Sequence, residues 1–327
     1  MLRRQFCLGS LAGAVWTGSA LPDPARAQGH YPSRPVTLVV PYAPGGSSDI
    51  MARILSNGLN AAWGQPVVVE NRGGGTTTVG TEYVARLPPD GHAMLLAPPP
   101  FVIAPFIYRN LGYDPVRDFT GVSLVAFYPL VLVVPAASPV NSLGELVAAA
   151  RARPGMAYPS PGAGTTPHLF GELLARRERL ELTHVPYRSG GQGVADLIGE
   201  RLQFYAGPTT EVVPHVQAGR LKAIAVLAEA RSAVLPGVPT ARESGFEGLD
   251  ASSWTTVAMA AATPPAMVAK VSADIAAITR QPEVRQRMEA QGAVFVGSSP
   301  TEASAFWAAE RLRWGPLITD LNITPNG

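Results

Sequence analysis

The chain has 327 residues, of which 26 are basic and 24 acidic, so that its formal net charge at pH 7 is only +2. This balance argues against a nucleic-acid partner, and the length suggests two domains, each with enough core to fold without covalent cross-links. Cys7 is the single cysteine, and it lies in a segment that we expect to be removed on export. The mature protein is therefore expected to contain no disulfide, no thiolate metal site and no cysteine nucleophile.

The first residues are typical of an export signal. Arg3 and Arg4 precede an apolar run over residues 6–16, and Ala25-Arg26-Ala27 has the small residues of a cleavage site. We predict a signal peptide over residues 1–27, cleavage after Ala27 and a periplasmic protein. Whether export uses the general or the twin-arginine route stays open.

Residues 36–55 predict a strand, a tight turn and a helix. The run over 36–40 is rich in β-branched residues, which is typical of a buried strand, and apolar residues recur at helical spacing over 50–55. Pro-Gly-Gly at 44–46 forms the turn, and Ser-Ser-Asp at 47–49 suits a helix start. Free backbone N–H groups at such a corner bind an anion without any lysine. A plain turn whose serines only cap the helix is the alternative.

The chain then continues to alternate strands with helices. We expect strands over 65–70 and 92–97, a glycine and threonine loop over 71–78, and a helix over 79–87. This spacing predicts an α/β domain with a largely parallel sheet.

Two long extended segments divide the chain. Residues 122–135 and 250–261 are longer and more apolar than ordinary strands need, and we interpret them as crossovers between domains. A second α/β unit lies between them, with helices over 143–152, 165–177, 191–199 and 209–218 and strands over 156–159, 183–185, 202–206 and 222–227. Helices over 264–279, 282–291 and 300–321 follow. The prediction is a discontinuous first domain, residues 28–128 plus 252–327, an inserted second domain, residues 129–251, and a cleft between them.

The second unit repeats the glycine-rich corner of the first. Residues 160–168 (Ser-Pro-Gly-Ala-Gly-Thr-Thr-Pro-His) connect a strand to a helix, with Thr165 or Thr166 as the cap. Two such corners facing one cleft suit a carboxylate, because each hydrogen bond to a charged oxygen contributes about 1.5–3 kcal/mol net. His168 and Arg188, each near a helix start, are further candidates to meet the ligand. A structural hydrogen bond for His168 and a solvated Arg188 are the alternatives.

Motifs for catalysis and for cofactors are missing from the sequence. No Gly-x-Ser-x-Gly nucleophile turn and no Gly-x-x-x-x-Gly-Lys phosphate loop occurs, and Gly162-x-Gly164 lacks the third glycine of a dinucleotide fingerprint. The histidines at 92, 168, 184 and 215 do not pair at metal-ligand spacing. We therefore predict a non-enzymatic protein with no catalytic residue, no metal and no cofactor.

Six segments in order carry a specific resemblance. They are 40–49 (Val-Pro-Tyr-Ala-Pro-Gly-Gly-Ser-Ser-Asp), 70–72 (Glu-Asn-Arg), 113–119 (Tyr-Asp-Pro-Val-Arg-Asp-Phe), 160–165 (Ser-Pro-Gly-Ala-Gly-Thr), 184–188 (His-Val-Pro-Tyr-Arg) and 235–240 (Leu-Pro-Gly-Val-Pro-Thr). Over about residues 31–322 the chain resembles the extracytoplasmic substrate-binding proteins of tripartite tricarboxylate transporters, often called Bug receptors. The resemblance implies a fold similar to type II periplasmic binding proteins, with two α/β domains, two crossover strands and an interdomain ligand cleft. It also implies that backbone and hydroxyl groups of the Pro-Gly-Gly loop, often with bridging waters, recognise a ligand carboxylate.

The sequence departs from that family's pattern at positions near the expected ligand. After Asn71-Arg72 the family usually has Pro-Gly-Ala-Gly-Gly, whereas this chain has Gly-Gly-Gly-Thr-Thr at 73–77. Gln203 and Gly207 stand where acidic residues are common, and two threonines follow Trp254 in place of an aromatic residue and glycine. These changes concern the identity of the ligand more than the fold.

We predict a monomeric solute-binding protein that captures a small organic carboxylate and delivers it to integral membrane transporter subunits. The candidate ligand-binding residues lie in the two corners and in the loops beside them: Tyr42, Ala43, Gly45, Gly46, Ser47, Ser48, Asp49, Thr76, Thr77, Thr78, Ser160, Gly164, Thr165, His168 and Arg188. Because the mature chain has only two lysines, Lys222 and Lys270, we expect a mono- or dicarboxylate with a sizeable neutral body. A ligand sensor that signals to a membrane kinase and a hydrolase with an unusual site are the alternatives.

Overall fold

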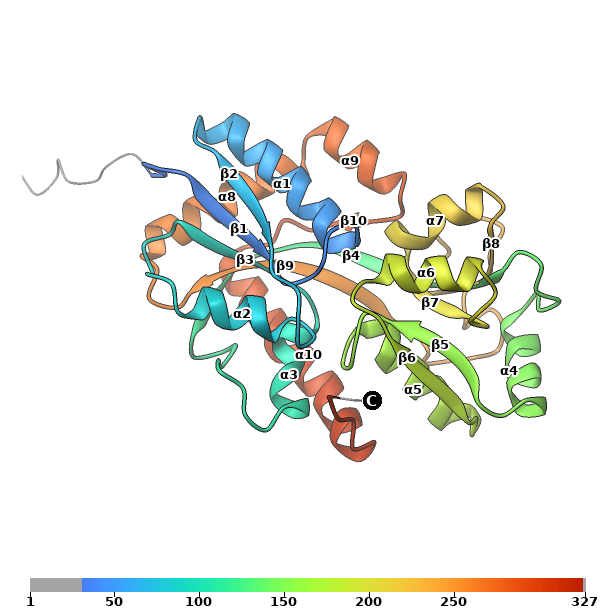
Figure 1. Cartoon of the computed structure of the whole chain (residues 1–327). Coiled ribbons are helices and arrows are strands. Elements are labelled where there is room, and N and C mark those ends of the chain that lie inside the picture. Colours follow the sequence, from blue (N-terminus) through green and yellow to red (C-terminus); the bar gives the residue numbers. More distant parts are fainter. Residues whose placement is uncertain (1–30, 326–327) are drawn as a thin grey trace, which may run out of the picture.

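The computed structural model describes residues 31–325, so the predicted signal peptide and its cleavage site lie outside the described residues. The chain is built on a mixed sheet with the strand order β10-β4-β9-β3-β1-β2, and a short pair of strands lies beside it (Figure 1). The strands of this order are β1 (Val36–Val40), β2 (Val67–Asn71), β3 (Ala93–Ala97), β4 (Phe119–Pro135), β9 (Ser252–Ala260) and β10 (Val294–Phe295). Among residues 31–325, no helix has the length and apolar character needed to cross a membrane.

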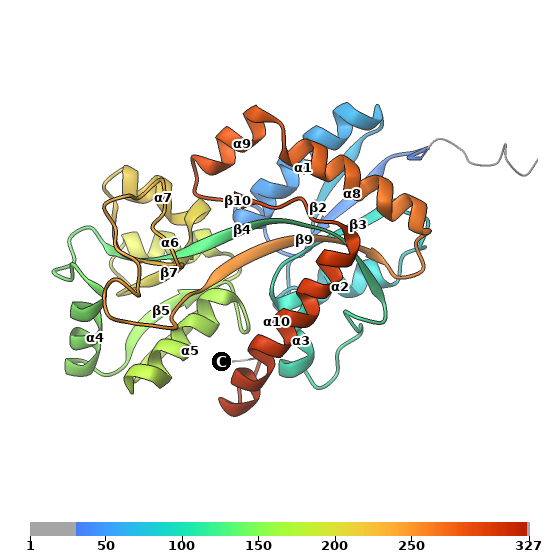
Figure 2. The ribbon, with the colours of Figure 1, turned by 180° about the vertical axis from the view of Figure 1, so that it is seen from behind.

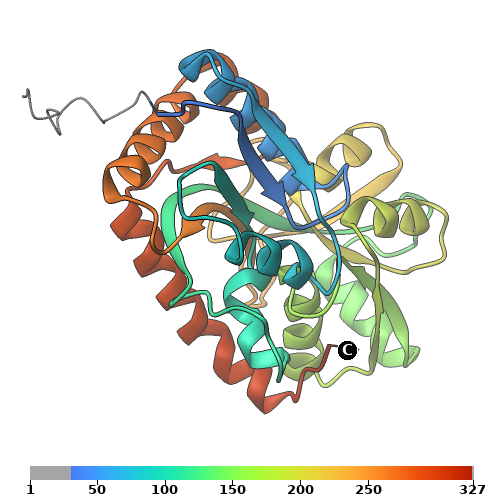
Figure 3. The ribbon, with the colours of Figure 1, turned by 60° about the vertical axis from the view of Figure 1, so that its left-hand side comes forward.

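Side-chain alternation along β1 divides the first part of the molecule into layers. Val36, Leu38 and Val40 pack into one core with α1 (Ser47–Trp63) and α8 (Pro265–Thr279). Val39 faces the opposite core, which contains residues of α3 (Pro100–Ile107) and α10 (Pro300–Asp320). Since successive side chains of a strand point to opposite faces, the apolar residues of β1 on both faces are buried, and Thr37 is the one polar residue of the strand. Helices accordingly cover both faces of this part of the sheet (Figures 1 and 3).

Sequence patterns located most elements within a few residues but missed α3 and the two-residue strand β10. Its start, Pro98-Pro99-Pro100, has the composition of a loop, yet proline is well tolerated in the first turn of a helix. The helix is buried almost throughout, so it has no amphipathic period to reveal it. α2 (Thr78–Ala85) agrees closely with the predicted helix over 79–87.

The two predicted crossovers are the long strands β4 and β9, which pair with each other in antiparallel register from Phe119↔Ala260 to Pro129↔Ser252. Figure 2 shows both strands running from one half of the molecule to the other. β1 is parallel to β2 and β3, but β9 is antiparallel to β3, and β10 is antiparallel to β4. The expected largely parallel sheet is therefore restricted to β1–β3, because the crossovers join the sheet and one of them returns in the opposite direction.

The second half of the molecule is built on the end of β4. Leu130 to Val133 pair with β7 and with β8, so the first domain's sheet continues into the second unit. Leu130, Leu132 and Val134 face α4 and α5, whereas Val131 and Val133 face α6 and α7. The elements of this half are α4 (Leu143–Ala152), β5 (Met156–Ser160), α5 (Thr166–Glu178), β6 (Leu182–Pro186), α6 (Gly190–Ile198), β7 (Tyr205–Pro208), α7 (Thr209–Gln217) and β8 (Leu221–Leu227). β5 and β6 form the separate parallel pair.

The C-terminal helices return to the first half, where α8, α9 (Pro282–Glu289) and α10 lie (Figure 2). A capping box at Ser299 and Glu302 begins α10. Trp254 of β9 donates its indole N–H to the buried Glu310 of α10 at 2.7 Å, which ties this helix to the return crossover. The cores of the two halves are thus largely distinct, although Leu169 of α5 packs into a core of the first half. The division into residues 28–128 plus 252–327 and residues 129–251 stays a prediction.

Candidate ligand-binding site

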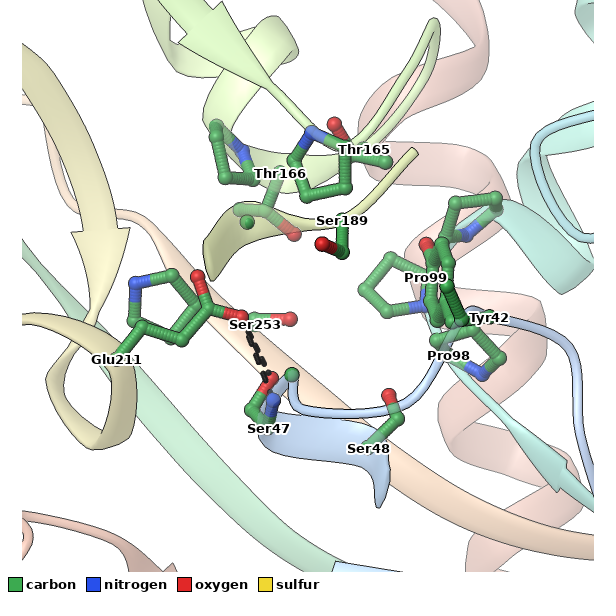
Figure 4. A pocket seen from close by; sticks show the side chains of 17 residues that line it. Tyr42, Ser47, Ser48, Pro98, Pro99, Thr165, Thr166, Ser189, Glu211 and Ser253 are labelled. Carbon is green, nitrogen blue, oxygen red and sulfur yellow. Dashed lines mark hydrogen bonds between the residues drawn. The ribbon is translucent and has the colours of Figure 1, made fainter. Parts of the chain in front are cut away.

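Helix N-termini from both halves of the molecule converge on one small cavity of about 40 Å³ (Figure 4). Most of its lining residues lie at the first turn, or just before it, of α1, α3, α5, α6 and α7, and Ser253 comes from β9. The lining residues are Tyr42, Ala43, Gly46, Ser47, Ser48, Pro98, Pro99, Pro100, Pro161, Thr165, Thr166, Pro167, Ser189, Gly190, Pro208, Glu211 and Ser253. The first N–H groups of a helix lack partners within it and form the positive end of its dipole, so this arrangement favours an anion.

The N-terminus of α1 already holds a carboxylate from the other half. Oε1 of Glu211 accepts hydrogen bonds from the Ser47 backbone N–H at 3.3 Å and the Ser47 hydroxyl at 3.4 Å. Oε2 accepts a hydrogen bond from the Tyr205 hydroxyl at 3.0 Å. Burial raises the pKa of Glu211, and the donors on Ser47 and Tyr205 oppose that rise.

Asp49 in the same first turn faces away from the cavity. Its carboxylate accepts the Gly45 N–H at 3.1 Å, the Asn71 side-chain amide at 3.1 Å and two bonds from Arg53. Burial alone would raise the pKa of Asp49, but these hydrogen bonds outweigh burial and hold the pKa below its usual value. Asp49 thus fixes the Pro-Gly-Gly turn from behind, and nothing places it on the cavity wall.

The corner before α5 is stabilised by neutral groups. Ser160 Oγ lies 2.6 Å from His184 Nε2 and bonds with Gly162, while Nδ1 of His168 accepts the Gly164 N–H at 3.1 Å. The two imidazole rings stack with centroids 3.9 Å apart. Burial lowers the pKa of His168 to about 3 and that of His184 to about 4, so both rings are uncharged at neutral pH.

Several hydroxyls on the cavity wall have no hydrogen-bond partner in the described part of the chain and are available to a ligand. Within the described part of the chain, no protein group is hydrogen-bonded to the hydroxyls of Ser48, Thr166, Ser189 and Ser253. The described lining contains no lysine, arginine or histidine, and Glu211 is its one carboxylate. The cavity thus offers hydroxyl and backbone donors, with no cationic side chain.

A wider cleft of about 710 Å³ adjoins the cavity and shares Tyr42, Ala43 and Pro161 with it. Its walls are the loop over 73–77 from the first half and residues 161–163 and 186–188 from the second. Thr76 and Thr77 have positive φ angles of 45° and 81°, which is uncommon for residues other than glycine. A Cβ on Gly162 would lie 2.6 Å from Thr76 Oγ1, so the two halves touch at the mouth of this cleft.

The structure distributes the predicted site residues over three places. Those on the cavity wall are Tyr42, Ala43, Gly46, Ser47, Ser48 and Thr165. Thr76, Thr77 and Arg188 line the wider cleft, to which Tyr42 and Ala43 also belong. Gly45, Asp49, Thr78, Ser160, Gly164 and His168 line neither space, and the hydrogen bonds of Asp49, Ser160 and His168 indicate that these three shape the corners.

Sequence reasoning missed part of the wall, namely Pro98, Pro99, Pro100, Pro161, Thr166, Pro167, Ser189, Gly190, Pro208, Glu211 and Ser253 as ligand-facing residues. Ser189 and Gly190 carried a usable signal, because a Ser-Gly-Gly turn opens a helix as Gly-Gly-Ser-Ser does at α1. Glu211 carried none, since an acidic residue in a first helical turn is ordinarily a solvated partner of the dipole.

Comparison with known proteins gives a consistent family. The model of the tripartite tricarboxylate transporter family receptor matches residues 51–323. A protein from the tcbD-tcbE intergenic region of Pseudomonas sp. (strain P51) is 36% identical over 99% of this chain and 96% of its own. Protein BugT of Bordetella pertussis is 34% identical over 89% of this chain and 90% of its own.

Solved structures agree with the sequence relatives. The periplasmic binding protein BugD has a TM-score of 0.85 and 31% identity, over 90% of this chain and 99% of its own. An R. palustris protein solved with adipate has a TM-score of 0.86 and 32% identity, over 90% of this chain and 99% of its own. The predicted binding-protein fold with two α/β domains is thereby confirmed. The chain belongs to the tripartite tricarboxylate transporter receptor family, the Bug proteins, whose members are periplasmic binding proteins and not enzymes.

Proposed function

We propose that this solute-binding protein captures a small organic carboxylate between its two halves and delivers it to the membrane subunits of a tripartite tricarboxylate-type transporter. One observation supports a carboxylate as the ligand: helix N-termini and free hydroxyls converge on a cavity whose described lining has no cationic side chain. Donors of this kind bind a carboxylate through about 1.5–3 kcal/mol per hydrogen bond, so three or four support micromolar affinity. Related proteins solved with adipate and with malate support the same ligand class.

Binding requires the two halves to separate and close. A volume of about 40 Å³ holds no more than a few water molecules, so in the present arrangement the body of an organic acid would have to lie in the adjoining cleft of about 710 Å³. The hydrogen bonds of Ser47 with Glu211 join the halves, so we expect them to open for ligand entry and to re-form on closure. β4 and β9 are the chain segments that would bend.

The ligand class is tested by native mass spectrometry of the freshly purified protein, followed by a thermal-shift panel of organic acids, amino acids and amides. A retained acid, or stabilisation by carboxylates, is the expected result. Stabilisation by neutral amides together with failure of every carboxylate would contradict the proposal. Small-angle scattering with and without a binding acid tests closure, for which a smaller radius of gyration is expected.

The export and delivery steps need separate measurements. We propose cleavage after Ala27, so the protein recovered from the periplasm is expected to begin at Gln28, and an intact Met1 on soluble cytoplasmic protein would contradict export. Cross-linking in membranes followed by pull-down is expected to recover integral transporter subunits. Recovery of a membrane kinase in their place would favour the sensor.

A further inference from the structure

Glu211 occupies the position at the start of α1 that a ligand carboxylate is expected to take. Its two oxygens together accept hydrogen bonds from the Ser47 N–H, the Ser47 hydroxyl and the Tyr205 hydroxyl. All three partners donate, which is the pattern that satisfies an ionised carboxylate. In Figure 4, Glu211 and Ser47 meet across the cavity from opposite halves of the molecule.

Neighbouring residues leave room for this carboxylate. A Cβ on Gly190 would lie 2.0 Å from Glu211 Oε2, so any other residue at Gly190 would displace the carboxylate. The next residue, Gly191, has no such constraint, because its Cβ would meet only a backbone oxygen at 4.0 Å. The space beside Glu211 therefore depends on one specific glycine at the start of α6.

The remaining donors lie on the other side of the cavity. The hydroxyls of Thr166 and Ser189 are free, and the first N–H groups of α5 and α6 have no partner within their helices. A ligand carboxylate placed there is held by donors from the second half. A second ligand carboxylate would have to approach Glu211, with no cation on the described cavity wall to separate the like charges.

We propose, on the basis of the proposed function, that Glu211 determines which class of carboxylate ligand the protein binds. It acts as a built-in carboxylate at α1, so the ligand presents one carboxylate to α5 and α6 and a hydrogen-bond donor, an ammonium, amide or hydroxyl group, to Glu211. The preferred ligand class is a monocarboxylate with a donor at its far end, and a dicarboxylate of equal length is disfavoured.

Competition calorimetry at pH 8 with five-carbon acids tests this directly. Glutarate has a second carboxylate, glutaramate and 5-aminopentanoate have a donor, and pentanoate has neither; four- and six-carbon analogues control for length. The wild type is expected to bind the donor-bearing acids at least about tenfold more tightly than the dicarboxylate, the ratio that one well-placed interaction of about 1.4 kcal/mol gives. Glu211→Gln is expected to shift that ratio by about tenfold towards the dicarboxylate.

Matched variants identify the cause. Gly190→Ala is expected to shift the ratio in the same direction by displacing Glu211, whereas Gly191→Ala is expected to leave it unchanged. Glu145→Gln removes an exposed first-turn carboxylate from α4 in the same half and serves as the charge control.

The outcomes separate the two proposals. A wild type that prefers the dicarboxylate overturns the role of Glu211, whatever the variants do. Glu211→Gln that tightens all acids equally also overturns it, because Glu211 would then be a placeholder that every ligand displaces. If no acid of the series binds the wild type and neutral amides do, the proposed function fails and the specificity role fails with it.

Discussion

The loops before α1 and before α5 face the same cavity from opposite halves, and each places glycines directly before hydroxyl residues at a helix start. At α1 the Ser47 N–H already binds a buried carboxylate, and Asp49 holds the turn from behind. At α5 the turn is held by neutral groups, among them His184 and His168, and no carboxylate of the described chain is hydrogen-bonded to the backbone of the helix start. Two similar sequence signals therefore differ in what they leave for a ligand: one corner is partly satisfied in advance, and the other is free.

This difference teaches that a helix N-terminus is an available anion site only if the rest of the fold leaves it empty. The hydrogen-bonding potential of a buried N–H group has to be satisfied, and an internal carboxylate does so as well as a ligand. Substitutions of the glycines, ionisable groups and hydroxyls that stabilise each corner therefore test this difference.

The largest effect is expected from Gly162→Val at the α5 corner. Gly162 has a φ of 120°, which a β-branched residue adopts only with strain, and its Cβ would lie 2.6 Å from Thr76 Oγ1. We expect a loss of about 2–4 kcal/mol in the free energy of unfolding and no measurable ligand binding. Urea unfolding and calorimetry measure both, and Gly237→Ala, with no atom within 4 Å and an ordinary φ, is the control. Normal binding by Gly162→Val would show that this corner tolerates rearrangement.

The next effect concerns acid stability and arises at the same corner. The pKa values of His168, about 3, and His184, about 4, lie below the unfolded value of about 6.5, so the unfolded chain binds more protons in this window. The contribution of these two histidines to the free energy of unfolding is therefore complete above pH 6.5 and is lost as the pH falls. Between pH 6.5 and 5 we expect a loss of about 2 kcal/mol from His168 and less from the partly exposed His184.

Urea unfolding at a series of pH values measures this loss, and His184→Gln should reduce the slope of stability against pH.

The pH dependence that Glu211 at the α1 corner contributes has the opposite sign, because the pKa of Glu211 is raised on folding. The folded state is favoured most at low pH, where Glu211 is protonated, and this contribution is lost as the pH rises above about 4.5. Glu211→Gln should remove that second component, and an unchanged profile in both variants would contradict the assignment.

Asp49→Ala is expected to cost about 2–3 kcal/mol, because it leaves the Gly45 N–H without its acceptor and removes one of the two hydrogen bonds that the Asn71 amide donates. Binding should weaken through loss of the turn's geometry, although Asp49 touches no cavity. Glu289→Ala breaks the exposed pair with Arg285 and is the control, with an expected change of less than about 1 kcal/mol. Equal effects of the two variants, measured by urea unfolding, would show that Asp49 does not anchor the turn.

Ser48→Ala is expected to have the smallest effect. It removes one free hydroxyl from the cavity wall but leaves the helix N–H groups in place. One hydrogen bond contributes about 0.5–1.5 kcal/mol, so calorimetry should show a weakening of no more than about tenfold and an unchanged melting temperature. A loss of several hundredfold would identify the Ser48 hydroxyl as the main anchor and reverse the emphasis on backbone donors.

The sequence by itself determined most of the elements, because their signals are local. The strand at β1 follows from its β-branched run. The helix predicted at 143–152 agrees with α4, whose start is capped by the hydrogen bond from the Glu145 N–H to the Ser142 hydroxyl. The long extended segments predicted the crossovers β4 and β9, and the glycine-rich turns predicted two of the helix starts that meet at the cavity.

Only the tertiary structure decided how those corners are used. Glu211 is a first-turn residue of α7, ordinary by its sequence, and it becomes a buried carboxylate only because β4 continues into the second half and brings α7 against α1. α3 became a helix because its apolar side chains fill the core beside α10. Propensity, capping and turn chemistry act over a few residues, whereas burial and the pairing of distant polar groups depend on contacts such as that between residues 47 and 211, which no local pattern encodes.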